Sequence, residues 1–419
     1  MSNPPEQRWV RIIPVAFIMY TIAYVDRTNI SLALPYIGRD LHMDPAQQGS
    51  AFGIFFAGYM LLQIPGGYLA EWWSAKRFVS TLLVVWGACA VGCGLVHTQM
   101  QFWIMRFLLG VAEGGVWPAT LILLAHWFPR GERARANAYW MLCLPAAVVV
   151  SSPLSGWILG RWGWRVMIVS EGALPFLWLL IWNWEVADHP REARWISGEE
   201  QEHLEQALHR ESAELEAQPQ ESILRTFARP TVLLLIVIYF LMNTGNYGYQ
   251  SWLPTAIKGS AKSLSNFQVG VLYALPYLIT MVGMILNSQH SDRMCERRAH
   301  LALALAWGGA TLMGGVLLNS ISPLLSFALI ALVGAGSYGG HGPFWAIPSE
   351  TLPRRVAGSA MGLINAIGNL GGYFGPYVAG YLNKRTGNFV YAFGALALAL
   401  LAGAALSMLL RPASGVRTT

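Results

Sequence analysis

The chain has 419 residues, of which 54% are hydrophobic and only 12% are charged, about half the charged fraction of an average soluble protein. Its apolar residues come in blocks of about 20, the length that crosses the hydrocarbon core of a bilayer as a helix. This composition excludes a soluble globular protein and predicts an all-α membrane protein, so we attribute the net charge of +6 to cytoplasmic loops and expect no nucleic acid as a partner.

Twelve membrane-spanning helices are predicted, in two groups of six. The first six cover residues 11–34, 50–70, 77–96, 101–126, 136–160 and 166–184. The second six cover residues 231–255, 267–288, 301–319, 323–348, 356–381 and 389–410. Between the groups lies a polar, charged stretch with helical spacing and many Glu in its middle. We therefore predict an N-terminal six-helix bundle (1–184), a cytoplasmic linker (185–230) and a C-terminal six-helix bundle (231–419).

The positive charges predict the orientation in the membrane. Twelve spans place both termini on one side. Of the 28 Lys and Arg residues, 19 lie in segments on that side and seven lie on the other. This excess predicts that both termini are cytoplasmic. Six tryptophans at block ends are expected to anchor at the bilayer interface: Trp72, Trp73, Trp127, Trp162, Trp164 and Trp184.

The first span contains two adjacent charged residues, Asp26 and Arg27, within the run YVDRTNIS (24–31). A charge at the bilayer centre costs at least about 2.5–3.5 kcal/mol. Neighbouring side chains on a helix point about 100° apart, so Asp26 and Arg27 cannot neutralise each other along one face and each needs a partner elsewhere. A structural ion pair between helices is one explanation, and it accounts more readily for one of the two residues than for both.

The fourth span supplies two further charges, Arg106 and Glu113. They are seven residues apart, so they share one helix face with about 10.5 Å between them along the axis. Two acids and two arginines in a low-dielectric cavity form a coupled set, because an anion that binds an arginine leaves a carboxylate free to hold a proton. The planar guanidinium of Arg also binds a carboxylate through two hydrogen bonds. We therefore predict that Arg27 and Arg106 belong to a substrate site and that Asp26 carries or relays a proton.

The loops after the second and eighth spans repeat one pattern, in the segments GGYLAEWWSAKRF and NSQHSDRMCERRAH. Each loop has an acid followed by a basic pair at the same spacing: Glu71, Lys76 and Arg77 in the first, and Asp292, Arg297 and Arg298 in the second. The repeat indicates duplicated halves, an arrangement in which transporters hold the substrate between the halves near the midplane. We predict that these residues form cytoplasmic gate pairs that lock an outward-open state. They must act as a network, because single exposed pairs contribute little.

The second half has no mid-span charge and offers amide side chains instead. Asn243, Asn246 and Gln250 follow i, i+3, i+7 spacing in the seventh span, and Asn365 and Asn369 follow i, i+4 spacing in the eleventh. Of these, Asn246, Gln250 and Asn369 are assigned to the substrate cavity, where amides recognise hydroxyl groups. The alternative is that the amides hold neighbouring helices together.

Aromatic side chains give weaker indications. Tyr59 and Trp345 are candidates for the cavity wall, with apolar packing as the alternative for both, and Tyr59 is included in the predicted substrate site. His341 lies toward the cytoplasmic end of the tenth span and is expected to be a hydrogen-bonded structural residue. The other aromatic residues are expected mostly at the bilayer interfaces, so they do not indicate the substrate.

Several motifs resemble those of a known transporter family. The loop after the second span resembles the signature loop of the major facilitator superfamily, with Glu71 in place of the usual Asp and Ser74 in place of the usual Gly. More specific are DRTNIS (26–31), RFLLGVAEGGVWPA (106–119), HWFPRGERARA (126–136), SSPLSGWIL (151–159), SEGALP (170–175), GPFWAIPSE (342–350) and NAIGNLGGYFGP (365–376). Together they are similar to the anion:cation symporter family, particularly its bacterial branch for tartrate, rhamnonate, phthalate and similar carboxylates.

The resemblance carries expectations for the fold and for the site. It implies a twelve-helix major facilitator fold in two pseudo-symmetric halves, a bacterial inner-membrane location and transport by alternating access. It also implies roles for Asp26 and Arg27 similar to those inferred above, and it makes Glu113 a second protonation site.

The predicted function is proton-coupled symport of a small organic anion, which could be a sugar acid, a hydroxy-dicarboxylate or an aromatic acid. We expect a monomer in the lipid bilayer, with protons as the coupling ion and with no cofactor or metal. The alternative in the same fold is an exporter or antiporter of drugs or sugars, although a cavity for cationic drugs would favour acids over Arg27 and Arg106. An enzyme is not expected, because the spans contain no Ser/His, paired-Asp or metal motif at a suitable spacing.

Overall fold

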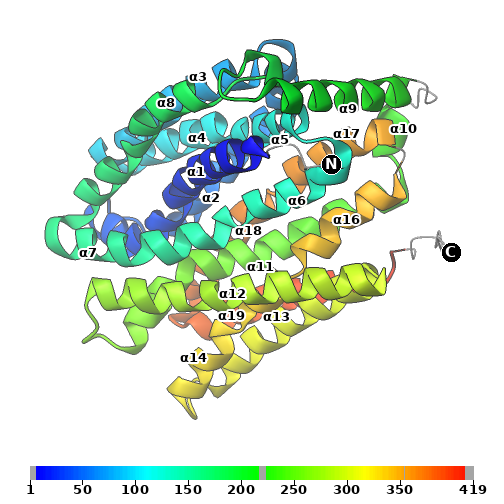
Figure 1. Ribbon diagram of the computed structural model, residues 1–419. Helices are drawn as coiled ribbons and strands as arrows, with labels where there is room; N and C mark the ends of the chain where they lie inside the picture. The colour runs from blue at the N-terminus through cyan, green and yellow to red at the C-terminus, as the bar shows by residue number, and fades with distance from the viewer. Residues whose placement is uncertain (1–5, 217–222, 353, 411–419) are drawn as a thin grey trace.

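The computed structural model describes residues 6–216, 223–352 and 354–410, and these residues form helices without a β-strand. Figure 1 shows the helices of the first half of the chain together in the upper part of the view, with most helices of the second half below them. The linker helix α9 lies outside both groups, along the first half. The architecture is therefore two helical bundles joined by a linker.

The helices have the following bounds. The first half contains α1 (Gln7–Asp40), α2 (Pro45–Trp72), α3 (Ala75–Leu95), α4 (Gln99–Gly114), α5 (Val116–Trp127), α6 (Arg130–Met141), α7 (Cys143–Gly172) and α8 (Leu174–Glu185). The linker contains the 3-10 helix η1 (Pro190–Glu192), α9 (Gly198–Glu216) and α10 (Ile223–Phe227). The second half contains α11 (Pro230–Ser260), α12 (Asn266–Met294), α13 (Arg298–Leu318), α14 (Pro323–Ala331), α15 (Val333–Ser337), α16 (His341–Thr351), α17 (Arg354–Gly368), α18 (Gly371–Thr386) and α19 (Phe389–Ser407).

The predicted spans can be traced in these helices. Within the described residues, 10 helical segments are long and apolar enough to cross a membrane. One of them, Gly131–Glu185, contains two predicted spans that turn at Gly163, whose φ of 85° favours glycine. The predicted span 356–381 corresponds to α17 and α18, which are not among the 10. Residues 1–5, 217–222 and 411–419, which belong to the predicted termini and linker, lie outside the described residues.

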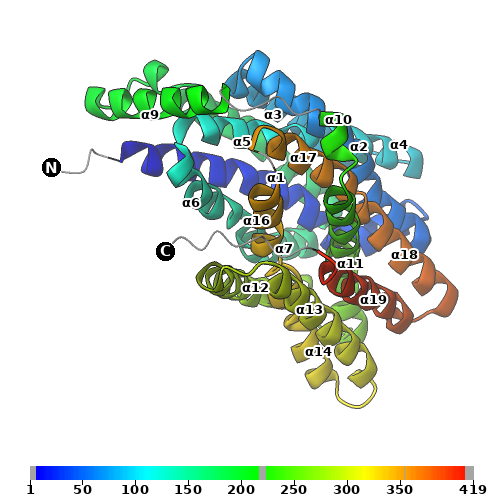
Figure 2. The ribbon, with the colours of Figure 1, turned by 90° about the vertical axis from the view of Figure 1, so that its right-hand side faces the viewer.

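The two ends of the molecule differ in how the halves meet. We call the end that carries the linker helices the linker end, which faces the viewer in Figure 2, and the opposite end, where α2 and α12 begin, the outer end. At the outer end the two halves are joined by polar contacts. Tyr36 donates a hydrogen bond to Oδ1 of Asn266 at 2.7 Å, and Nζ of Lys384 lies 2.8 Å from Oδ2 of Asp44. The outer end is therefore closed.

Two close helix pairs, which we call the glycine seams, complete this closure. One seam joins α2 to α18, and the other joins α7 to α12. A Cβ added to Gly49 of α2 would lie 2.2 Å from the carbonyl oxygen of Pro376, and one added to Gly270 of α12 would lie 2.2 Å from that of Ser152. Only glycine allows backbones to approach so closely, which is how small residues pack helices inside membranes.

The glycine seams also reveal an internal repeat. Helix α2 begins with Asp44 as N-cap, which forms a capping box with Gln47, and α12 begins with Ser265, which forms the same box with Gln268. The seam glycine follows each N-cap by five residues, in the segments DPAQQG (44–49) and SNFQVG (265–270). The two halves therefore share the beginning of this helix as well as the loop that follows it.

The predicted tryptophan anchors are partly wrong. Trp72, Trp73, Trp162 and Trp184 are exposed, as an interface anchor must be. Trp127 and Trp164 are instead buried. Trp127 stacks on Trp195 of the linker with ring centroids 5.0 Å apart, and its indole donates a hydrogen bond to the carbonyl of Ala187 at 2.9 Å. Trp164 donates to Asp40 at 2.8 Å. The Trp127 indole therefore holds the linker against the first half, and the Trp164 indole holds the end of α1 at Asp40.

Candidate functional site

A central cavity lies between the two halves, and its empty space, counted together with the part open to solvent, is about 480 Å³. The first half contributes side chains to its wall from α1, α2, α5, α6 and α7. The second half contributes from α11, α16, α17 and the breaks beside them. The lining residues are Tyr20, Tyr24, Arg27, Tyr59, Trp117, Met141, Leu144, Tyr239, Asn243, Tyr247, Tyr338, His341, Trp345, Asn365 and Asn369.

Arg27 lies in the wall of the central cavity and is paired with Glu113 of α4. Its Nε donates a hydrogen bond to Oε2 of Glu113 at 3.0 Å, and both side chains are buried. The guanidinium also lies over the rings of Tyr59 and Phe55, at 4.6 and 5.1 Å from their centroids. Among the described residues, Nη2 of Arg27 and Oε1 of Glu113 have no hydrogen-bond partner. The pair therefore keeps a free donor and a free acceptor inside the membrane.

Asp26 points away from the central cavity, as expected for a residue adjacent to Arg27 on a helix. Its Oδ2 accepts a hydrogen bond from the indole of Trp86 in α3 at 2.6 Å. Nη1 of Arg106 donates to the backbone carbonyl of Asp26 at 3.2 Å. Together with Asn29, Asp26 and Arg106 line a second, smaller cavity enclosed by α1, α3, α4 and α7. The side chains of Asp26 and Arg27 therefore point in different directions, as the helix geometry predicts.

The structure places Arg106, a predicted substrate residue, in the smaller cavity. Arg106 does not line the central cavity, and its Nε and Nη2 have no partner among the described residues. Sharing a helix face with Glu113 was not sufficient, because the helices of the first half enclose the outer part of that face. Arg106 can therefore influence Asp26, whereas a substrate in the central cavity does not reach it.

The predicted amides separate into two groups. Asn369 lines the central cavity at the break between α17 and α18, and Asn243 lies beside it. Asn246 and Gln250 are buried and do not line this cavity in the structure. Neither polar atom of the Asn246 amide has a partner among the described residues.

Gln250 instead connects the two halves. Its side-chain carbonyl accepts hydrogen bonds from the hydroxyls of Tyr338, at 3.1 Å, and of Tyr24 in the first half, at 3.3 Å. A second amide bridge joins Asn365 to Gln63 at 2.7 Å. These bonds cross between the halves beside the cavity, so the alternative interpretation, that amides hold helices together, applies to Gln250.

The aromatic wall is the feature that sequence reasoning missed. Tyr59, predicted in the site, lines the cavity, and so does Trp345, for which apolar packing was the alternative. Six further rings share the wall: Tyr20, Tyr24, Trp117, Tyr239, Tyr247 and Tyr338. The signal was their position, because these residues fall inside the apolar blocks and not at the block ends, where interface anchors belong. His341 also lines the cavity, and its Nδ1 lies 3.1 Å from the carbonyl oxygen of Tyr338, so it is hydrogen-bonded as expected.

The residues of the first predicted gate do not pair with one another in this structure. Oε2 of Glu71 lies 3.7 Å from Nε2 of His126, and Glu71 makes no ion pair with Lys76 or Arg77 in the part of the chain that the structure describes. Sequence reasoning missed Asp188 of the linker, which accepts a hydrogen bond from the backbone of Lys76 at 2.9 Å and so caps α3.

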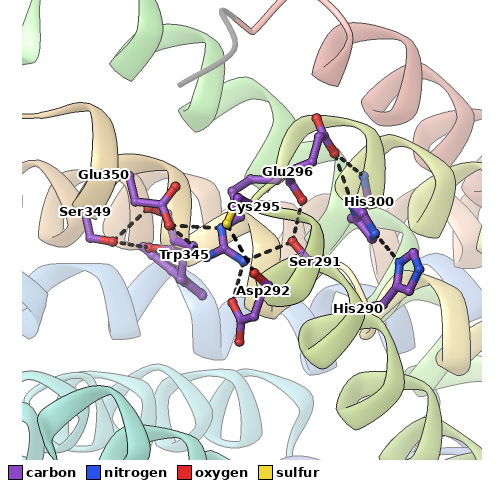
Figure 3. A network of polar contacts seen from close by, with 11 residues as sticks. His290, Ser291, Asp292, Cys295, Glu296, His300, Trp345, Ser349 and Glu350 are labelled. Carbon is purple, nitrogen blue, oxygen red and sulfur yellow. Dashed lines mark hydrogen bonds and ion pairs between the residues drawn. The ribbon is translucent and has the colours of Figure 1, made fainter. Parts of the chain in front are cut away.

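Figure 3 shows the polar contacts around Asp292, a residue of the second predicted gate. Arg297 pairs with Asp292, and its guanidinium also bonds Glu350 at 2.9 Å. Burial acts to lower the pKa of Arg297, but the bonds to Glu350 and Asp292 outweigh it and hold that pKa above its usual value. Arg298 donates instead to the backbone carbonyl of Leu410 at 3.4 Å. All of these contacts lie within the second half, so the network does not lock the two halves together in this structure.

Two six-span halves around a central cavity with a buried ion pair define a membrane transporter that works between two bundles. The chain belongs to the Major Facilitator Superfamily, whose family model matches residues 16–376. It is therefore a multi-pass transporter and not an enzyme, and the predicted superfamily and twelve-helix fold are confirmed.

Individual relatives support the same assignment. The chain is 32% identical over 406 residues to the "Quinolone resistance transporter" of Acinetobacter baumannii, covering 94% of this chain and 91% of that protein. It is 31% identical over 412 residues to a "Putative tartrate transporter" of Agrobacterium vitis, covering 96% and 90%. The inward-open structure of the xylose transporter XylE from E. coli superposes with a TM-score of 0.77 at 16% identity, covering 97% of this chain and 98% of that one, which shows the fold alone. The predicted similarity to organic-acid transporters of this superfamily is confirmed.

Proposed function

We propose that the protein is a proton-coupled symporter that brings a small organic anion across the bacterial inner membrane by alternating access. The observation that carries this proposal is the buried pair of Arg27 and Glu113 at the wall of the central cavity. The substrate is a sugar acid, a hydroxy-dicarboxylate or an aromatic acid. The protein acts as a monomer, uses protons as its coupling ion and needs no cofactor.

The pair couples the two transported species through competition for one guanidinium. A carboxylate that enters the cavity binds Arg27 through its free Nη2 edge and weakens the bond from Nε to Glu113. Glu113, buried and now without its counter-charge, is then stabilised by a proton. Anion and proton are therefore bound together, and they leave together when the cavity opens on the other side.

Asp26 is proposed as the relay between Glu113 and the outer side. It lies one residue from Arg27 but faces the second cavity, where Arg106 and Trp86 hold it. A proton that reaches Asp26 from the outer end needs to cross only the helix that separates the two cavities. This proposal gives Arg106 the role of orienting the relay and leaves substrate binding to Arg27.

The linker end is proposed to face the cytoplasm. Most of the Lys and Arg residues outside the spans lie in segments at this end, which is the arrangement expected of cytoplasmic loops. The glycine seams close the outer end, and we propose that the structure corresponds to an inward-facing state. In that state the gate residues Asp292 and Arg297 bond within their own half. A lock between the halves remains a proposal for the outward-open state.

The second candidate function is export of drugs, and one observation favours it. The "Quinolone resistance transporter" is the relative quoted above with the highest identity. Quinolones carry a carboxylate on an aromatic ring system, so Arg27 suits such a substrate as well. Drug export and anion uptake therefore differ in the direction of transport and in the proton coupling, and the chemistry of the cavity does not distinguish them.

Proteoliposome uptake tests the proposed function. A thermal-shift screen of the purified protein against a panel of organic acids first identifies a ligand, because a ligand bound only by the folded state stabilises it. Uptake of that ligand should then follow an inward proton gradient, stop with a protonophore and be unaffected by sodium. Uptake that continues with the protonophore but requires sodium would refute proton coupling. If the ligand accumulates inside the vesicles only when the proton gradient points outward, ligand and protons move in opposite directions, and this result would support the exporter.

A further inference from the structure

The central cavity offers one fixed positive charge. Among the described residues that line it, Arg27 is the single Arg or Lys, because Arg106 lies in the separate cavity within the first half. A dicarboxylate would place its second carboxylate against amides, hydroxyls and rings. Burying a charge without a counter-charge is strongly unfavourable, so this wall selects against a second carboxylate. His341 is the one other group in the wall that can become positive, and its ring is stacked on Tyr338 with centroids 5.3 Å apart.

Several polar groups of the wall are already bonded to protein. The hydroxyls of Tyr20 and Tyr59 lie 3.3 Å apart and bond each other, and those of Tyr24 and Tyr338 bond Gln250. Nδ2 of Asn243 donates to the carbonyl of Gly368 at 3.2 Å, and Nδ2 of Asn369 donates to that of Asn365 at 2.8 Å. A sugar acid could use these particular groups only by breaking their bonds.

Aromatic rings face the cavity from both halves. In the first half, Trp117 meets Tyr20 edge to face, with centroids 5.3 Å apart and 67° between the planes. In the second half, Trp345 meets Tyr239 in the same way, at 5.1 Å and 68°. Each edge-to-face contact holds a ring at a fixed angle in the wall. A flat aromatic body in the cavity can therefore contact rings on both sides without disturbing the polar network.

We infer that the preferred substrate is an aromatic monocarboxylate, an acid with one carboxylate on a flat ring. The inference rests on the proposed function and narrows its substrate class. The carboxylate binds Arg27, and the ring lies between Trp117 of the first half and Trp345 of the second. Aliphatic dicarboxylates, which the sequence left open, are disfavoured by the single positive charge, and sugar acids, also left open, gain nothing from the aromatic rings of the wall.

Matched acids test the inference on the purified full-length protein. Benzoate and cyclohexanecarboxylate carry the same charge, and isophthalate adds a second carboxylate to the benzoate ring. We expect benzoate to bind at least about threefold more tightly than cyclohexanecarboxylate, because ring–ring contacts favour the aromatic acid. We expect isophthalate, tartrate and gluconate to bind at least about tenfold more weakly than benzoate. Affinities can be measured by isothermal titration calorimetry at one pH.

Variants of the two tryptophans test the contacts themselves. Trp117→Leu and Trp345→Leu should each weaken benzoate binding by about two- to tenfold and remove the preference over cyclohexanecarboxylate. Trp157→Leu is the matched control, because Trp157 is 51% exposed and does not line the cavity. Trp345 is only half-buried, so its variant decides the question even if Trp117→Leu, which also loses contact with Trp140, fails to fold.

The possible failures can be distinguished. Tartrate, gluconate or isophthalate binding more tightly than benzoate, with all binding lost in Arg27→Ala, would overturn the aromatic monocarboxylate and keep the organic-anion symporter. A dicarboxylate preference that disappears in His341→Phe would overturn it too, and would make His341 the second cation. Binding of every acid unaffected by Arg27→Ala would instead remove the basis of the proposed function.

Discussion

Replacing Glu113 by Gln is expected to separate substrate binding from proton coupling. In the structure, Glu113 is fully buried, and its Oε2 accepts a hydrogen bond from Nε of Arg27 at 3.0 Å. The amide of Gln keeps the size of the side chain and a carbonyl acceptor. It removes the negative charge that competes with the substrate for Arg27, so the variant imitates the protonated acid.

The size of the effect follows from the geometry of the pair. Opposite unit charges 4 Å apart attract by about 4 kcal/mol at an effective dielectric constant of 20. In the variant, a hydrogen bond from the charged Arg27 to the Gln carbonyl still contributes about 1.5–3 kcal/mol of attraction. The difference of about 1–2.5 kcal/mol predicts about 5- to 70-fold tighter substrate binding, at a pH where Glu113 of the natural protein is ionised.

Two transport measurements on the same proteoliposomes test the prediction. Counterflow exchange should continue in Glu113→Gln, because no proton has to leave the carrier while substrate is exchanged for substrate. Accumulation driven by a proton gradient should be lost, because the empty carrier must release its proton to return. Glu171→Gln is a matched control: Glu171 is also buried, but it bonds Ser155 at 2.6 Å and Asn29 at 2.8 Å, outside the central cavity, and its variant should still accumulate substrate.

Three results would contradict this reasoning. Full proton-driven accumulation by Glu113→Gln would remove Glu113 from the coupling mechanism. Loss of counterflow together with uptake would make Glu113 a binding or structural residue, since exchange needs only a folded site. Tighter binding with unchanged coupling would show that the charge opposes the substrate without holding the transported proton.

Substitutions at three further positions have defined outcomes. Arg27→Lys and Arg27→Ala should both abolish uptake while the protein keeps its size-exclusion profile, because Lys lacks the planar fork, and normal uptake by the Lys variant would show that the fork is irrelevant. Asp26→Asn should retain counterflow and lose proton-driven uptake; loss of binding would instead assign Asp26 to the orientation of Arg106, which bonds its carbonyl. Lys384→Met removes an exposed ion pair with Asp44 and should change the outward-open population by less than about fivefold. Spin-label distances between α2 and α18 measure this population, and a larger change would contradict the weak role of the pair.

Helix periodicity was sufficient to predict the directions of Asp26 and Arg27 but not the surroundings of Arg106. The angle between adjacent side chains is a property of one helix, so it can be read from the sequence. Which neighbouring helices enclose a given face depends on the packing of the whole bundle. Arg106 and Glu113 share a face of α4, yet Arg106 lines the smaller cavity, whereas Glu113 bonds Arg27 of the central cavity. Periodicity alone does not contain that information.

Other differences come from contacts between residues far apart in the chain. Asp188 caps α3 although 112 residues separate it from Lys76, so no local pattern indicated it. The aromatic wall could have been predicted from the sequence, because Tyr239 and Tyr247 lie inside an apolar block instead of at its end. The repeated segments DPAQQG and SNFQVG were also present in the sequence. Their alignment would have extended the evidence for duplicated halves from the gate loops to the outer end.

The glycine seams have a mechanical consequence for the transport cycle. At several points of each seam backbone rests on backbone: a Cβ on Gly380 would lie 2.2 Å from the carbonyl oxygen of Pro45, and one on Gly156 would lie 2.4 Å from that of Asn266. At these points no side chain interlocks with the opposite backbone. Because α2 with α18 and α7 with α12 repeat the same contact, the halves can pivot as rigid bodies, and a single methyl group in either seam would act as a wedge that holds the outer mouth open.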